Sequence, residues 1–189
     1  MRKILLMAFI VSASMILNVS AATFEVDPVY SSIIFKLRHL SGYSIGNFNT
    51  FQGFIDTTDD FGKITGISAK VLIPSINTRH PERDADLLSE RFFDAEKFPV
   101  GTFVGKKIEG GKLIGDLTLK GKKKEVALDY KYYGTAKDQF GRTKAGFSAS
   151  GIINRKDFGI SFNKKIDNGQ MLLGDDVELI IEIEGILKD

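Results

Sequence analysis

Apolar residues that recur at every second position constrain the fold of this chain more than any other feature. Across 177–184 the odd positions are Val, Leu or Ile, whereas three of the four even positions are Glu. Neighbouring side chains of a β-strand point to opposite faces, so this alternation predicts a strand with one buried face. Related alternation occurs at 33–39, 69–73, 113–119, 126–132 and 147–153.

Turn signals separate these runs and indicate how the strands connect. Glycine-containing pairs occur at 110–111, 120–121 and 168–169, and an aspartate-rich turn occurs at 59–62. Short connections of this kind join antiparallel neighbours. About eight strands at this spacing in one domain predict an all-β fold, either an antiparallel up-and-down barrel or a sandwich.

Segment 81–97 interrupts the strand pattern and predicts a short helix. Pro81 suits the first position of a helix, and Leu87 and Phe92 lie within helical reach of each other. A turn should follow the helix before the chain becomes extended again. A segment of this kind is suited to cap one end of a barrel.

The N-terminus has the pattern of a cleaved export signal. Arg2 and Lys3 supply the positive start, 4–17 is apolar, and small residues at 19–22 suit cleavage. The apolar stretch is too short for a stable membrane span. The sequence therefore predicts two segments, a signal peptide at 1–21 and one domain at 22–189.

The charge balance gives no reason to expect a polyanionic partner. The chain has 26 Lys and Arg residues against 24 Asp and Glu, and removal of Arg2 and Lys3 with the signal leaves 24 of each sign. A neutral domain is not typical of nucleic-acid binding, so we expect no nucleic-acid partner. The chain has no cysteine, which excludes disulfides and thiol catalysis.

Residue types suited to catalysis or metal binding are few. His39 and His80 are the two histidines, and neither belongs to a nucleophile pattern or to a metal-ligand spacing. We therefore predict no catalytic residue, no metal and no cofactor. His39 shares the inward face of its strand, where it is either a core residue or a ligand contact. Gly115 and Gly151 also fall on inward faces, where missing side chains favour a hollow barrel.

Several segments occur in an order that resembles a known family. They are 31–40, 82–84, 92–94, 97–99, 115–119, 145–147 and 153–159. Together they are similar to the YceI-like family of polyisoprenoid-binding proteins, from about Thr23 to the C-terminus. The resemblance implies a lipocalin-like antiparallel barrel of about eight strands around a long apolar tunnel. It also implies a periplasmic location and an isoprenoid or other long-chain lipid as the ligand, bound without metal.

Lipid binding in such a tunnel depends on apolar contact, which contributes ~0.8 kcal/mol for each buried CH2 group. We predict that the tunnel wall includes Phe35, Leu37, Phe48, Phe51, Phe54, Phe103, Leu117, Phe147, Phe158 and Leu179. We predict that the polar end of the ligand meets Arg38, His39, Arg83, Asn154 and Asp157. These two sets form the predicted lipid-binding site.

The chain departs from the family pattern at three positions within segment 81–97 and at one position in a hairpin. The family usually has His and Arg at the positions of Asp86 and Leu88, and Asp at the position of Arg91. It commonly has His at the position of Lys120. These differences bear on the ligand preference rather than on the fold.

The leading hypothesis is a binding or carrier protein and not an enzyme. One alternative is an enzyme that acts on a lipid or quinone, with His39 as acid or base assisted by Arg83 or Asp84. Another is a protein-interaction module with a solid barrel, which an internal cavity would argue against. Homodimer formation through an exposed face is compatible with each hypothesis.

Overall fold

A computed structural model describes residues 21–58, 60–167 and 169–188. The predicted signal peptide at 1–21 therefore lies outside the described residues, except for its last position. No helix within the described ranges is long and apolar enough to cross a membrane.

Antiparallel strands make up most of the described chain. Their bounds are β1 (Ala21–Val26), β2 (Ser32–His39), β3 (Gly42–Phe48), β4 (Phe51–Thr58), β5 (Ile64–Leu72), β6 (Ile76–Asn77), β7 (Val100–Glu109), β8 (Lys112–Leu119), β9 (Lys122–Lys137), β10 (Thr143–Asn154) and β11 (Leu173–Leu187). Every strand ladder is antiparallel, as the short turns predict.

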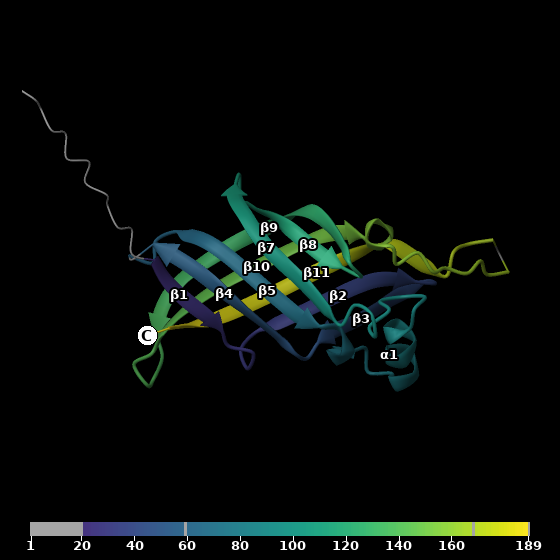
Figure 1. The fold of residues 1–189 in the computed structure, drawn as a ribbon, viewed down its shortest axis with the longest axis horizontal. Helices are drawn as coiled ribbons and strands as arrows, with labels where there is room; N and C mark the ends of the chain where they lie inside the picture. The colour runs from purple at the N-terminus through teal and green to yellow at the C-terminus, as the bar shows by residue number, and fades with distance from the viewer. Residues whose placement is uncertain (1–20, 59, 168, 189) are drawn as a thin grey trace, which may run out of the picture.

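The strands close into a barrel. The order β1-β4-β5-β7-β8-β9-β10-β11 forms a ring because β11 also pairs with β1. This eight-strand ring confirms the predicted barrel and excludes the sandwich. One edge of β11 is shared: its C-terminal end pairs with β1, and the rest pairs with β2, which continues into β3 and β6 (Figure 1).

The predicted helix is present as α1 (Pro81–Leu88). His80 caps its start, because the His80 Nδ1 atom accepts a hydrogen bond from the backbone N–H of Arg83 at 3.3 Å. The helix ends at Ser89, where the backbone N–H donates to the carbonyl of Asp86. Two short 3-10 helices, η1 (Ile73–Ser75) and η2 (Arg155–Phe158), also interrupt the strands.

Aromatic residues pack together beside the β4–β5 turn. The ends of β4 and β5 that meet at this turn lie at the end of the barrel opposite α1 (Figure 1). Phe24 is fully buried, and its ring meets the Phe61 ring edge-on with 5.5 Å between centroids. Phe61 lies in the β4–β5 turn with φ 56°, a left-handed conformation that is costly for a bulky residue. The Tyr132 hydroxyl donates a hydrogen bond to the Phe61 carbonyl at 2.9 Å. We call these three residues the aromatic plug.

Candidate functional site

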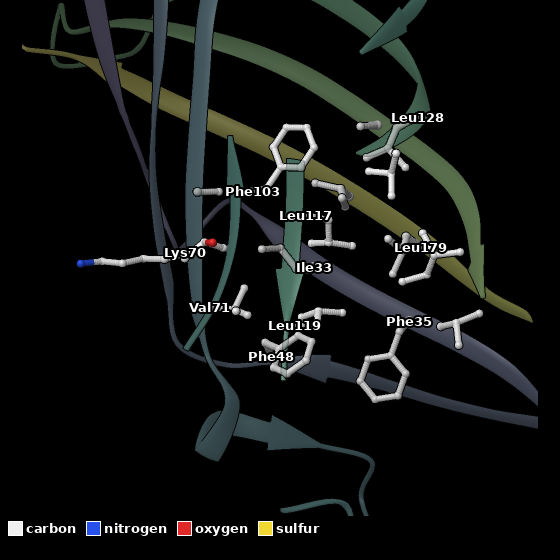
Figure 2. A pocket seen from close by; sticks show the side chains of 18 of the residues that line it. Ile33, Phe35, Phe48, Lys70, Val71, Phe103, Leu117, Leu119, Leu128 and Leu179 are labelled. Carbon is white, nitrogen blue, oxygen red and sulfur yellow. The ribbon is translucent and has the colours of Figure 1, made fainter. Parts of the chain in front are cut away.

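An apolar cavity runs inside the barrel between the aromatic plug and α1. Its volume is about 190 Å³, far above the roughly 10–15 Å³ that one water needs. The surface that it presents is apolar. Figure 2 shows Phe35, Phe103 and Leu179 among the side chains that surround it, whereas the Lys70 side chain points away.

The period-two pattern explains why the wall is apolar. In β11 the residues Val177, Leu179, Ile181 and Ile183 all line the cavity. Glu178 and Glu184 lie at alternate positions and form ion pairs with lysines of adjacent strands. Glu178 pairs with Lys36 at 3.0 Å, and Glu184 pairs with Lys144 at 2.5 Å. The alternation therefore separates an apolar interior from a charged exterior along one strand.

Most of the predicted tunnel residues lie at this cavity. Its lining includes Phe35, Leu37, Phe48, Phe54, Phe103, Leu117, Phe147 and Leu179. Two of the predicted wall residues lie elsewhere. Phe51 borders a second hollow beside β3, and Phe158 is 1% exposed in the core at η2. Contact of any of these residues with a ligand stays a prediction.

The residues predicted to meet the polar end of a ligand lie outside the cavity lining, and their contact with a ligand stays a prediction. Arg38 is exposed, and its Nε donates to the Leu40 carbonyl at 3.1 Å, while His39 pairs with Gly42 in the β2–β3 ladder. The Arg83 Nε donates to the Thr78 hydroxyl at 2.7 Å. Asn154 caps η2 through a bond from the backbone N–H of Lys156 at 3.0 Å, and Asp157 is exposed. None of the five belongs to the described lining of the cavity.

Arg155 is a cavity residue that the sequence analysis did not select. It is 4% exposed, and its guanidinium donates to the carbonyls of Gly174, Ile160 and Phe162 at 2.7–2.8 Å. It also pairs with Asp175 at 3.0 Å. Burial lowers the pKa of Arg155, and the carboxylate of Asp175 opposes that shift. The signal was available, because Arg155 continues the inward odd-numbered positions of β10.

The α1 end of the cavity is covered by the segment that follows the helix. Leu87, Phe92 and Phe93 line the cavity there. The Phe92 ring lies 5.1 Å from the Phe162 ring, and the Arg91 guanidinium stacks on Phe162 at 4.4 Å from its centroid. This contact joins the segment after α1 to the loop after η2.

The positions that depart from the family pattern contact their surroundings at this cover. Arg91 forms an ion pair with Asp86 at 2.5 Å, so two of the departures bind each other. The Lys120 Nζ atom donates to the Glu90 carbonyl at 2.7 Å, which joins the β8–β9 hairpin to the cover. These side chains therefore stabilise the closed end of the cavity.

The inward glycines do not create the cavity, so that prediction was wrong. A Cβ atom at Gly115 would lie 2.5 Å from the Phe103 ring, and one at Gly151 would lie 2.8 Å from a Leu128 methyl group. The space above each glycine is therefore filled by a large side chain from a neighbouring strand. Glycine allows that close packing, and the cavity lies elsewhere between large apolar side chains.

The chemistry that this arrangement supports is apolar contact in the absence of water. Among the described lining residues, Lys70 and Arg155 are the ionisable ones. Lys70 points away (Figure 2), and Arg155 is a cation whose donors are engaged by backbone carbonyls and by Asp175. Within the described ranges, no group of three or more His, Asp or Glu side chains is placed to hold a metal ion.

Comparisons with known proteins agree with this geometry. The family model named YceI-like domain matches residues 24–185 of this chain. A UPF0312 protein of Staphylococcus epidermidis is 37% identical over 159 residues, covering 82% of this chain and 92% of that protein. The crystal structure of a Campylobacter jejuni YceI protein superposes on this chain with a TM-score of 0.67 and 100% of both chains covered. The two sequences are 29% identical. A polyisoprenoid-binding domain from Saccharophagus degradans has the same fold, with 10% identity, a TM-score of 0.64, and coverage of 90% of this chain and 100% of that one.

Proposed function

Because the chain belongs to the YceI-like family, we propose that it binds a long-chain isoprenoid or a related amphipathic lipid inside its barrel. The observation that carries this proposal is the elongated apolar cavity between the aromatic plug and α1. Each CH2 group that leaves water for such a cavity contributes ~0.8 kcal/mol. A long chain therefore binds tightly with few polar contacts.

The cavity also favours this function over the alternatives. A protein-interaction module with a solid barrel has no use for an internal space of about 190 Å³. An enzyme acting on a lipid would need an acid or base at the cavity. His39 lies instead at the end of β2, where it pairs with Gly42 and Leu173. Binding without chemical conversion is therefore the function that we favour.

Export of the protein is part of the same proposal. The support is the pattern of the first residues, with its positive pair, apolar stretch and small residues before 22–189. A carrier in the periplasm gives an apolar ligand a route through an aqueous compartment. Detection of a mature chain that begins near Ala22 in a periplasmic extract would test this part.

The lipid-binding proposal is tested by native mass spectrometry of gently purified protein, followed by extraction and identification of bound molecules. A prenyl or acyl species at one per chain supports it. An Ala69→Phe variant adds a ring at an inward position of β5 and should lose this species. Lys70→Phe places the same ring on the outward side of the same strand and should keep it (Figure 2). Wild-type protein that stays free of lipid even after lipid is added would overturn the proposal.

A further inference from the structure

A second hollow lies where the wall of the barrel is not joined by a strand ladder. Among the described strands, β3 pairs with β2 and β6, whereas β4 pairs with β1 and β5. The turn at 49–50 connects β3 to β4, and the two strands diverge from there. A hollow of about 400 Å³ lies between them and the β1–β2 loop. We call it the seam hollow.

The seam hollow adjoins the apolar cavity. Ile33 and Phe48 line both spaces, so these two residues form the partition between them. Phe51 and Ile45 add apolar surface to the seam hollow. The two spaces are therefore neighbours, separated by the side chains of Ile33 and Phe48.

The lining of the seam hollow also includes polar residues and one positive charge. Arg79 is the one ionisable residue in its described lining, which contains no carboxylate. Within the described part of the chain, Arg79 forms no ion pair with an acidic side chain. Three asparagine amides, from Asn47, Asn49 and Asn77, surround the same space.

A hydrogen bond fixes the backbone of Arg79 at the seam hollow, and its side chain is exposed. The Asn77 side-chain oxygen accepts a bond from the backbone N–H of Arg79 at 2.8 Å. Arg79 has φ 62°, in the left-handed region that few residues other than glycine adopt. The Asn47 amide donates to the Asn49 side-chain oxygen at 2.7 Å, which orders the opposite side of the hollow. A charged side chain in an unusual backbone conformation therefore stands beside ordered amide groups.

We infer that the seam hollow binds the anionic head of the lipid, a carboxylate or a phosphate, and that Arg79 is the residue that binds it. A guanidinium matches both groups because it donates parallel hydrogen bonds to two oxygens. The amide groups of the three asparagines supply further donors. This inference rests on the proposed function, since it requires the apolar chain to occupy the adjoining cavity.

The test compares acidic and neutral ligands that carry the same chain. The probes are a fluorescent fatty acid with its methyl ester, and farnesyl phosphate with farnesol. Arg79→Gln should bind each acidic probe about tenfold more weakly, the loss expected for one charge-assisted hydrogen bond. Its affinity for the neutral probes should stay unchanged. Arg142→Gln removes an exposed arginine in the turn between β9 and β10, outside the seam hollow, and should leave all affinities unchanged.

The outcomes separate this inference from the proposed function. Equal affinity of wild-type protein and Arg79→Gln for the acidic probes would overturn the head-group site and leave the tunnel intact. An equal loss for acidic and neutral probes would also overturn it, because Arg79 would then act on the fold. A wild-type protein that binds none of the probes would refute the tunnel itself. A loss for the fatty acid alone, or for farnesyl phosphate alone, would identify which head group the site accepts.

Discussion

At the scale of single residues, the buried guanidinium of Arg155 lies at the cavity, and its environment explains why the fold tolerates it. Arg155 gives its donors to three backbone carbonyls and to Asp175. The carbonyls of Ile160 and Phe162 belong to the loop between η2 and β11, whose described residues form one isolated bridge and no named strand, and Gly174 lies at the start of β11. Arg155 therefore supplies hydrogen bonds that a neighbouring strand would otherwise supply, and it holds this loop beside the cavity.

Replacement of Arg155 by Met should destabilise the protein by about 3 kcal/mol, because it leaves buried carbonyls without donors. Asp175 keeps its ion pair with Lys156 at 2.6 Å, which limits the loss. Urea unfolding at neutral pH measures the effect. Arg38→Met is the control, since Arg38 is exposed, and it should change stability by less than about 0.5 kcal/mol. Equal losses in the two variants would contradict a structural role for Arg155.

Tyr130 makes stability depend on alkaline pH. Burial, with a smaller effect from Tyr132, raises the pKa of the Tyr130 hydroxyl from 10.0 to about 12. A raised pKa in the folded state means that the neutral form is favoured there. The contribution of the neutral Tyr130 hydroxyl to the free energy of unfolding is complete below about pH 10 and is lost as the pH rises toward about 12. Tyr130→Phe should flatten the fall in the urea midpoint over this range, and an unchanged slope would count against it.

At the scale of elements, close approach between strands requires particular glycines. In the β7–β8 pair, Gly115 lies directly against Phe103 and the carbonyl of Val104. A Cβ atom at Gly146 of β10 would lie 3.5 Å from the Tyr133 ring, which is an ordinary van der Waals contact. Both positions lie inside strands, and neither has a positive φ. The two glycines therefore differ in packing and not in backbone conformation.

Gly115→Ala should destabilise the protein by about 1–3 kcal/mol, because the added methyl group overlaps a backbone oxygen that cannot move aside. Gly146→Ala should stay within about 0.5 kcal/mol of the wild type. Thermal and urea unfolding of both variants check the difference. If Gly115→Ala is as stable as Gly146→Ala, the close contact with Phe103 does not constrain β8.

The alternation of residues predicted much of the barrel and of its lining, because strand geometry imposes the period of two. It placed Phe147 and Leu179 at inward positions, and both line the cavity. Alternation does not reveal where a side chain bonds to the backbone of a nearby residue. The Asn154 side-chain oxygen, for example, accepts from the N–H of Lys156 and so caps η2. The seam hollow could not be predicted from alternation, because it forms where the consecutive strands β3 and β4 do not pair. Arg79 and Phe51 line this hollow.

At the scale of the whole molecule, the aromatic plug fills part of the barrel interior at the end opposite α1. Phe24, Phe61 and Tyr132 pack there within the larger core cluster. We therefore expect the plug to limit the length of chain that the cavity accepts. This property does not depend on the chemistry of the head group.

Affinity should rise with chain length and then stop rising. Each added CH2 group contributes ~0.8 kcal/mol while it still enters the cavity, and nothing once the cavity is full. Displacement of a fluorescent probe by fatty acids of increasing length measures this. Phe61→Ala should move the plateau toward longer chains, whereas Phe140→Ala, at an exposed hairpin tip, should not. A plateau at the same length in all three proteins would show that the aromatic plug does not set the limit.

The pairing of the first strand with the last has a consequence for how the protein is made. β1 needs β11 to complete its hydrogen bonds, and Phe24 lies opposite Leu187, near the C-terminus. The ring cannot close until the ribosome has finished almost the entire chain, and contacts between such distant segments form slowly. The nascent polypeptide therefore remains open throughout its synthesis, which is the condition in which a narrow secretion pore can still thread it.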